Sequence, residues 1–270
     1  MMMESFLSRF SRTSPKLRSI IYKPLYQFMA RSYQKSDWKF MNYGYAPVSG
    51  ENLNIRLDEA DIDNRFCIQL YDHCAELIDL RGLEVLEVGS GRGGGADYIK
   101  RYLEPEKMVG MDFSEEAVRL SNENYDLDGL SFKTGNAESL PFRDSSFDVV
   151  INVESSHCYS SMDAFLAQVQ RVLRQGGYFL YADFRRTEDV EKLRQSLTNS
   201  GLRLINETDI TQNIIEALKL DHERKTALIK DQAPKPLAGF FHEFSGTNGS
   251  LIYDRFIRGE TMYLSFVFQK

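Results

Sequence analysis

The residues best suited to chemistry begin with a glycine-rich run at 87–95, Glu-Val-Gly-Ser-Gly-Arg-Gly-Gly-Gly, between a short apolar stretch and a segment of helical periodicity. Glycine has no Cβ, so this backbone can turn sharply and approach a ligand closely. The first N–H groups of the following helix have no partners within it and can bind polar ligand atoms. Asp112 ends the next expected strand, where a carboxylate can hold both hydroxyls of a ribose. The pattern indicates a nucleoside-containing cofactor.

The glycine run alone fits two classes of enzyme. Gly89, Gly91 and Gly94 match the GxGxxG fingerprint of nicotinamide and flavin enzymes. Glu87, two residues before the first glycine, instead suits a cofactor with a cationic amino-acid part, because its carboxylate would sit poorly beside a pyrophosphate. An NAD-dependent oxidoreductase is therefore the alternative enzyme, and a catalytically inactive cofactor-binding partner subunit is the alternative outside the enzymes.

A second pair of residues is suited to proton transfer. His157 follows the fourth expected strand, and Asp183 ends the fifth. Ligands of open parallel sheets bind at the carboxyl ends of the strands, so these two side chains can meet there. Histidine takes up protons near neutral pH, and a carboxylate can orient its ring and stabilise its cation. We expect His157 to be a general base backed by Asp183; the alternative is that His157 only packs against the cofactor.

The elements that must position these residues alternate along the chain. Strands are expected at 82–88, 108–112, 130–134, 147–152, 178–183, 202–210 and 261–269, and helices at 61–80, 95–102, 114–124, 162–173, 190–200 and, as one long or broken helix, 211–230. Strands that alternate with helices at this spacing form βαβ crossovers. The predicted fold is α/β, with a Rossmann-like seven-stranded, mostly parallel sheet and helices on both faces.

The chain is expected to have three parts. Residues 1–60 form an N-terminal helical arm or lid, residues 61–211 and 259–270 form the Rossmann-like cofactor-binding core, and residues 212–258 form a helical substrate cap inserted before the last strand. Tyr33, Tyr43 and Tyr45 are candidates for a lid over the cofactor, although packing in the core is an equal alternative. His242 lies in the expected cap and can face the substrate.

Composition and charge narrow the partners. The 270 residues are 42% hydrophobic and 27% charged, which is typical of a soluble globular protein. The three cysteines are scattered and no acid cluster is evident, so no metal site is expected. Residues 1–36 hold seven basic residues and one acid (+6), so the total of −6 leaves −12 on the rest. An acidic body argues against nucleic acid. The basic arm can contact an anionic membrane or an acidic carrier protein.

No stretch has the roughly 20 apolar residues that span a bilayer, and no secretory signal is evident. The expected location is the cytoplasm, with peripheral membrane contact through the basic arm as an addition. The aromatic content of 12% suits a hydrophobic acceptor, although core packing explains it equally well.

Further motifs carry a family resemblance. Gly-Asn-Ala-Glu-Ser-Leu-Pro-Phe at 135–142 follows the third expected strand, Phe-Asp-Val-Val at 147–150 enters the fourth, and Arg-Val-Leu-Arg-Gln-Gly-Gly at 171–177 precedes the fifth. With the glycine run, these motifs resemble class I S-adenosylmethionine-dependent methyltransferases over residues 60–185. The resemblance implies the cofactor S-adenosyl-L-methionine, the product S-adenosyl-L-homocysteine, and these cofactor-binding residues: Glu87, Gly89, Ser90, Gly91, Gly93, Asp112, Phe113, Asn136, Ala137, Glu138 and Asn152.

In that family the glycine loop contacts the methionine part of the cofactor, the acid after the second strand holds the ribose, and the turn after the third strand lines the adenine. Many relatives have aspartate where this chain has Asn136, but an amide oxygen can still accept a hydrogen bond from the adenine amino group.

A narrower resemblance comes from Asn-Val-Glu-Ser-Ser-His-Cys-Tyr at 152–159, together with Tyr-Ala-Asp at 181–183. These segments are similar to the phthiotriol and phenolphthiotriol dimycocerosates O-methyltransferases and related natural-product tailoring enzymes. The resemblance implies O-methylation of a hydroxyl on a hydrophobic small molecule or lipid of polyketide or peptide–polyketide type. C- or N-methylation of a sterol-like, prenyl-like or alkaloid acceptor is the alternative.

Overall fold

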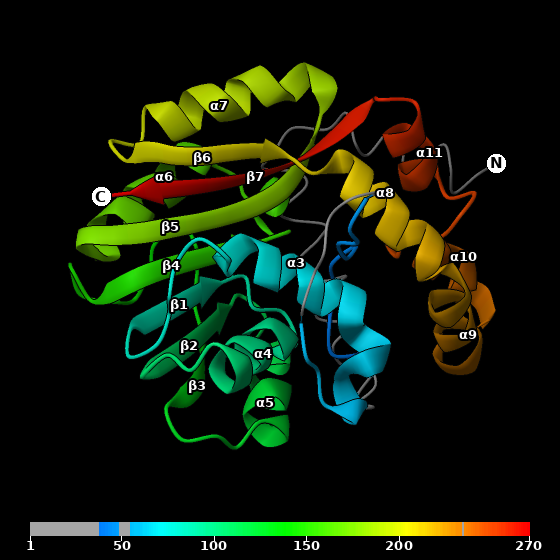
Figure 1. Ribbon diagram of the computed structural model, residues 1–270, viewed down its shortest axis with the longest axis horizontal. Coiled ribbons are helices and arrows are strands. Elements are labelled where there is room, and N and C mark those ends of the chain that lie inside the picture. The colour runs from blue at the N-terminus through cyan, green and yellow to red at the C-terminus, as the bar shows by residue number, and fades with distance from the viewer. Residues whose placement is uncertain (1–37, 49–54, 234) are drawn as a thin grey trace.

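The computed structural model describes residues 38–48, 55–233 and 235–270 (Figure 1). At its centre lies a seven-stranded sheet with the order β3-β2-β1-β4-β5-β7-β6. The strands are β1 (Glu84–Val88), β2 (Lys107–Asp112), β3 (Leu130–Thr134), β4 (Phe147–Val153), β5 (Leu173–Arg186), β6 (Arg203–Asp209) and β7 (Thr261–Gln269). Strands β1 to β5 pair in parallel, whereas β7 runs antiparallel to both β5 and β6. The predicted Rossmann-like, mostly parallel sheet is confirmed.

Helices cover both faces of the sheet (Figure 1). They are α3 (Arg65–Ala75), α4 (Gly94–Tyr102), α5 (Glu115–Asn124), α6 (Met162–Val172) and α7 (Val190–Thr198). Neighbouring residues of a strand point to opposite faces. Accordingly, Val85 belongs to the core shared with α3 and α4, and Leu86 belongs to the core shared with α6 and α7. Apolar residues at successive strand positions therefore build two cores.

The region between β6 and β7 is helical. It holds α8 (Thr211–Leu220), α9 (His222–Gln232), α10 (Ala238–Phe244) and α11 (Leu251–Ile257). The helix expected at 211–230 is broken at Asp221, whose buried carboxylate accepts hydrogen bonds from Arg224 at 2.6 Å. These helices lie where the sequence predicts a substrate cap, and that role stays a prediction.

Strand β5 is longer than the 178–183 expected from the sequence. Strand β7 pairs with it from Tyr178 to Arg186, and this partner supplies hydrogen bonds well beyond Asp183. The helix expected at 61–80 is shorter than predicted, because a 3-10 turn (Glu59–Asn64) precedes α3 and the helix ends at Ala75. Pairing with distant strands, rather than local periodicity, sets the length of β5.

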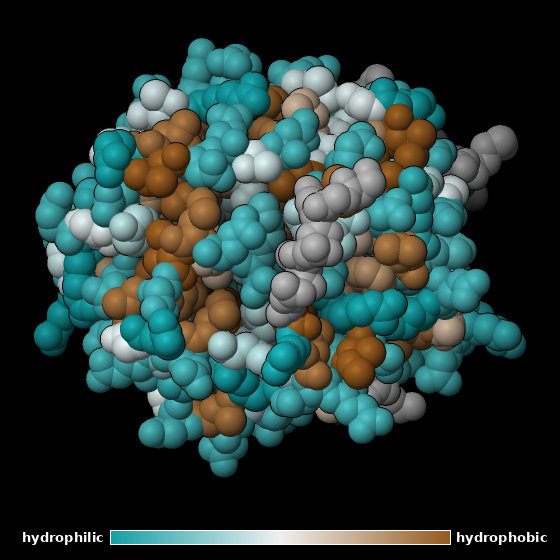
Figure 2. Space-filling view, in the orientation of Figure 1, coloured by the Kyte–Doolittle hydropathy of each residue, from teal (hydrophilic) through white to brown (hydrophobic). Residues whose placement is uncertain are grey.

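The segment 38–48 lies between α3 and the helices that follow β6. Its backbone bonds to both sides, since Tyr45 N donates to Phe66 O at 2.8 Å and Ala46 N donates to Asn213 O at 3.2 Å. Tyr33 and the basic residues 1–36 lie outside the described residues. No helix in the described ranges is long and apolar enough to cross a membrane. In the view of Figure 2, hydrophobic residues form separate patches on a largely hydrophilic surface.

Candidate active site

The glycine loop joins β1 to α4 and needs glycine at its first position. Gly89 has φ +83°, a left-handed conformation that side chains disfavour. A Cβ built there would lie 1.9 Å from Ser155 Oγ, so the segment after β4 closes directly onto the loop. The loop is also tied to β2, because Gly89 N and Ser90 N both donate to Met111 O at 2.7 and 3.0 Å. The loop is thereby held against the carboxyl ends of β2 and β4.

Asp112 organises the same edge of the sheet. Its Oδ2 accepts a hydrogen bond from Gly91 N and its Oδ1 accepts one from Ser114 N, each at 2.9 Å. The side chain is buried, and burial raises the pKa of the carboxyl to about 6, although these N–H donors oppose the rise. Asp112 thus connects the glycine loop to the start of α5.

A cavity of about 550 Å³ opens at this edge. The predicted cofactor residues that line it are Gly89, Ser90, Gly91, Asp112, Phe113, Asn136, Ala137 and Glu138. Residues that sequence reasoning missed also line it: Phe40, Met41 and Asn42 come from the segment before α3, and Tyr71 comes from α3 itself. Nothing in the local sequence pattern of 38–42 marks it as a cavity wall, because only the fold brings it there.

Glu87, Gly93 and Asn152 lie behind the cavity wall. Glu87 is fully buried; Tyr71 Oη donates to its Oε1 at 2.7 Å, and its Oε2 has no hydrogen-bond partner among the described residues. Burial raises the pKa of Glu87 to about 7, an effect that the Tyr71 hydrogen bond opposes. Asn152 Nδ2 donates to Val88 O at 2.7 Å, and Gly93 leaves room for the ring of Phe132.

The turn after β3 is bonded to the segment after β4. Asn136 Oδ1 accepts a hydrogen bond from Glu138 N at 2.9 Å, so this amide oxygen helps to shape the turn. Glu138 Oε1 accepts hydrogen bonds from Ser160 N at 2.6 Å and Ser161 N at 3.1 Å. The wall expected to face adenine is therefore coupled to the loop that carries His157.

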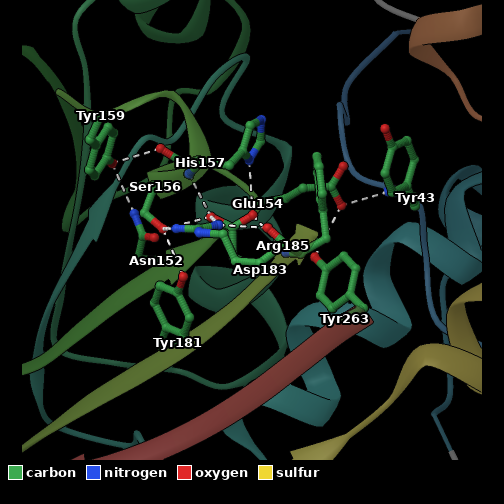
Figure 3. A network of polar contacts seen from close by, with 12 residues as sticks. Tyr43, Asn152, Glu154, Ser156, His157, Tyr159, Tyr181, Asp183, Arg185 and Tyr263 are labelled. Atoms are coloured by element: carbon green, nitrogen blue, oxygen red, sulfur yellow. Dashed lines mark hydrogen bonds and ion pairs between the residues drawn. The ribbon is translucent and has the colours of Figure 1, made fainter. Parts of the chain in front are cut away.

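The structure brings His157 and Asp183 together (Figure 3). His157 Nδ1 lies 2.9 Å from Asp183 Oδ1, and the aspartate side chain is fully buried while the histidine is 17% exposed. Asp183 Oδ2 also accepts a hydrogen bond from Ser156 Oγ at 2.6 Å and forms an ion pair with Arg185 at 3.1 Å. The imidazole packs against Phe184, with ring centroids 4.4 Å apart. Its ring position is therefore fixed from two sides.

Charges set the protonation of this pair. Burial alone would raise the pKa of Asp183, but Arg185 and His157 hold it well below its usual range. For His157, burial disfavours the imidazolium, yet interactions with Cys158 and Asp183 outweigh burial and raise its pKa to about 10. In the protein alone, the pair is therefore an imidazolium next to a carboxylate at neutral pH.

Glu154 is an acid in the cavity wall to which sequence reasoning assigned no chemistry. Its Oε2 accepts hydrogen bonds from Tyr43 N at 2.9 Å and from Tyr263 Oη at 3.0 Å (Figure 3). Burial raises the pKa of its carboxyl to about 8, against the opposing effects of the Tyr43 N–H and His157. Its partners lie more than a hundred residues away in the chain, so no sequence motif reveals them.

Neither His157 nor Asp183 is among the residues that line the 550 Å³ cavity, although Ser155 and Cys158 on either side of His157 are. The lid and cap candidates that the structure describes also lie outside that lining. Tyr43 is buried against Phe184, with ring centroids 5.5 Å apart, and Tyr45 stacks on His73 at 4.6 Å. His242 lies on α10, and its Nδ1 is 3.1 Å from Thr247 Oγ1. The packing of Tyr43 and Tyr45 agrees with the alternative that these tyrosines belong to the core. A lid role for the two tyrosines and a substrate contact for His242 stay predictions.

The site suits a cofactor that carries positive charge. Glu87 and Asp112 form no ion pair with lysine or arginine in the part of the chain that the structure describes, and both have raised pKa values because they are buried. Ser90 Oγ is buried at the loop and has no partner among those residues. The sheet, the glycine loop and these acids define a class I, Rossmann-like enzyme that binds a nucleoside cofactor.

Comparison with known proteins identifies the family within this class. A family model described as "Methyltransferase domain" matches residues 86–181. The chain is 35% identical to the phthiotriol/phenolphthiotriol dimycocerosates methyltransferase of Mycobacterium tuberculosis, covering 98% of this chain and 97% of the relative. It is 33% identical to the fatty-acid O-methyltransferase of Mycolicibacterium smegmatis, covering 96% and 93%. The chain belongs to this methyltransferase family and is an S-adenosylmethionine-dependent enzyme.

Solved structures show the same fold. The [4+2]-cyclase SpnF superposes with a TM-score of 0.68 at 19% identity, covering 92% of this chain and 94% of that one. The geranyl diphosphate C-methyltransferase of Streptomyces coelicolor, in complex with S-adenosyl-L-homocysteine, superposes with a TM-score of 0.63 at 14% identity, covering 90% and 97%. At such identities the likeness concerns the fold alone, so the reaction must be argued from the site.

Proposed function

We propose that this protein transfers the methyl group of S-adenosylmethionine to an oxygen atom of a hydrophobic lipid or natural-product acceptor. The observation that carries the proposal is the His157–Asp183 pair beyond the cofactor loop, joined at 2.9 Å and anchored by Arg185. The printed names of two relatives, which concern dimycocerosates and fatty acids, support a lipid-type oxygen acceptor.

The cofactor would supply an electrophilic methyl group on a positively charged sulfur. The glycine loop would hold its methionine part, Asp112 its ribose, and the turn at 136–138 its adenine. Glu87, buried behind the loop, would offset its positive charge. Holding donor and acceptor in line removes a large entropic barrier, so positioning is a main contribution of these residues.

His157 would take the proton of the acceptor oxygen. Nδ1 is engaged by Asp183, so Nε2 on the opposite side of the ring is the atom that would receive this proton. The imidazolium that results is stabilised by the buried carboxylate. Because the pKa of His157 is about 10 in the protein alone, the neutral imidazole is a minor species at neutral pH. A cation bound nearby disfavours the imidazolium and moves that pKa toward neutrality.

The test uses purified protein, S-adenosylmethionine with a deuterated methyl group, and three probes: a long-chain fatty acid, a long-chain diol and an amine of the same chain length. Mass spectrometry should find the label on an oxygen of the acid or the diol. Labelling of the amine alone, or of none of the probes, would contradict oxygen methylation.

His157→Ala tests the role of the base. On the diol, whose hydroxyl must lose a proton, it should lower kcat by roughly 100-fold, because a positioned general base contributes about that much, while cofactor affinity by calorimetry changes little. His222→Gln is the matched control, since His222 Nδ1 accepts a hydrogen bond from Asn248 N at 3.1 Å and His222 is not among the residues that line the cavity. Full turnover by His157→Ala would refute the assignment of the base.

A further inference from the structure

Glu154 occupies a strained position at the end of β4. Its φ is +48°, in the left-handed region that non-glycine residues avoid at a cost of about 1–2 kcal/mol. Its N–H donates to Ala182 O at 2.7 Å, and it directly precedes Ser155, which closes onto the glycine loop. Strain of this kind persists where the surrounding structure imposes it, and it concentrates at functional sites. The strained backbone of Glu154 therefore indicates that its side chain has a function in the cavity.

The two oxygens of the Glu154 carboxyl have different surroundings. Oε2 accepts two hydrogen bonds, from Tyr43 N and Tyr263 Oη, as Figure 3 shows. Oε1 takes part in no hydrogen bond or ion pair with the described residues. Because Glu154 lines the cavity and Oε2 is engaged by Tyr43 and Tyr263, Oε1 is the oxygen available to a bound molecule. An oxygen that accepts two donors is suited to be the carbonyl oxygen of a neutral carboxylic acid, with the proton on the other one.

The groups around Glu154 favour this neutral form. Burial is the largest influence, and Asp183 on β5 adds to it, which together raise the pKa to about 8; the Tyr43 N–H, His157 and Tyr263 oppose the rise. Tyr71 and Cys67 on α3 also interact electrostatically with Glu154. Two cations belong to the same network: Arg185 pairs with Asp183 at 3.1 Å, and Lys225 donates to Tyr43 O at 3.1 Å. In the protein without cofactor, the neutral form of Glu154 therefore predominates at neutral pH. A bound cation lowers this pKa, as it does those of Asp112 and Glu87, so a role as hydrogen-bond donor requires the carboxyl to stay protonated when the cofactor is present.

We propose that neutral Glu154 donates a hydrogen bond from Oε1 to the acceptor atom and thereby selects oxygen over nitrogen acceptors. A hydroxyl oxygen has two lone pairs and one proton. One lone pair attacks the methyl carbon, the second accepts the Glu154 hydrogen bond, and the proton passes to His157. The O–C bond forms as the C–S bond of the cofactor breaks, and Glu154 keeps its proton throughout.

A neutral amine cannot make the same set of interactions. Its nitrogen has a single lone pair, and that pair is consumed in the attack, so the Glu154 donor would compete with methyl transfer. The carboxylate of a fatty acid retains free lone pairs after one of them attacks and can accept the bond. The inference rests on the proposed methylation at oxygen and adds the residue that recognises the acceptor atom.

Two substitutions separate a donor from a base. In Glu154→Gln, the amide oxygen can still accept from Tyr43 N and Tyr263 Oη while the amide N–H donates to the acceptor. This variant should stay within about tenfold of wild-type kcat/KM and should lose the decline in rate above about pH 8. Glu154→Leu should lose roughly 100-fold on the diol or fatty acid and much less on the amine. Glu191→Gln, on the exposed face of α7, is the matched control.

An infrared measurement tests the protonation of Glu154 without any reaction. With saturating S-adenosylmethionine and no acceptor, the difference spectrum between wild type and Glu154→Gln should show a protonated-carboxyl band at about pH 6.5 that disappears at about pH 9.5. Absence of the band at the lower pH would overturn the proposal whatever the enzyme methylates. A second outcome would overturn only this proposal: wild type methylates oxygen, but Glu154→Gln is inactive although it still binds the cofactor. Glu154 would then be a base. Methylation of the amine alone would overturn both proposals.

Discussion

Replacing Asp112 by alanine should remove most of the cofactor affinity. The carboxylate lies in the cavity wall and is held by Gly91 N and Ser114 N at 2.9 Å each, with its orientation set for a ligand. A hydrogen bond to a charged group contributes about 1.5–3 kcal/mol, so two bonds to a ribose amount to about 3–6 kcal/mol. At about 1.4 kcal/mol per factor of ten, the Kd should rise roughly 100- to 10,000-fold.

The same substitution should affect folding less strongly. It leaves Gly91 N and Ser114 N without their carboxylate partner, but both border an open cavity where water can replace it. A loss of about 1 kcal/mol for each gives about 2 kcal/mol, or roughly 4–8 °C in Tm for a chain of this size. Thermal unfolding without cofactor separates this effect from binding.

Titration calorimetry with S-adenosylmethionine and with S-adenosyl-L-homocysteine measures the affinity. Asp126→Ala is the control, because Asp126 lies in the exposed stretch after α5 and should leave both the affinity and the Tm unchanged. If Asp112→Ala binds the cofactor within about threefold of wild type while Asp126→Ala behaves normally, the ribose is held elsewhere and the assignment of this edge is wrong.

Three further predictions concern the same pocket. Gly89→Ala should destabilise the fold by about 2 kcal/mol or more in urea unfolding, because its Cβ would meet Ser155 Oγ at 1.9 Å and φ is +83°; a wild-type midpoint would contradict the geometry. Cofactor affinity should rise with pH up to about 7 and then level off. In the protein alone, burial raises the pKa of Asp112 to about 6 and that of Glu87 to about 7. The bound cationic cofactor favours the carboxylate form of both groups, so binding is weaker at a pH where they are protonated. Calorimetry across this pH range should therefore detect proton release on binding. An affinity that does not change with pH would contradict the link to Asp112 and Glu87. Tyr71→Phe removes the donor to Glu87 Oε1 and should shift that rise to higher pH, since the lost hydrogen bond had favoured the carboxylate.

The electrostatic state of the site links these predictions to the reaction. Glu87, Asp112 and Glu154 have raised pKa values because they are buried, while Asp183 keeps its charge through Arg185. The acids at the glycine loop are matched to a positively charged cofactor. The carboxyl of Glu154, which faces the remaining space, is matched to an acceptor atom that can accept a hydrogen bond. The cavity wall therefore offers acids for the cationic cofactor at the glycine loop and a hydrogen-bonding carboxyl for the acceptor at Glu154.

The sequence by itself determined the core of the fold and the position of the cofactor loop. Short apolar strands that alternate with amphipathic helices leave a parallel sheet as the arrangement that buries both faces. The glycine run follows the first expected strand and Asp112 ends the second, and parallel strands place their carboxyl ends at one edge of the sheet, so the two were expected at the same edge. His157 and Asp183 were likewise expected to meet, because each lies at the carboxyl end of an expected parallel strand; the structure adds that β4 and β5 are adjacent.

Only the tertiary structure decided what surrounds these residues. The segment at 40–42 and Tyr71 reach the cavity through the packing of α3, and β5 extends to Arg186 because β7 pairs with it. Glu154 Oε2 accepts hydrogen bonds from Tyr43 N and Tyr263 Oη, which lie 111 and 109 residues away in the chain. These contacts leave Oε1 as the oxygen that a bound molecule can reach. Periodicity and motifs describe interactions between near neighbours in the chain. Burial and long-range hydrogen bonds, which set the protonation of an acid, exist only once distant segments have come together.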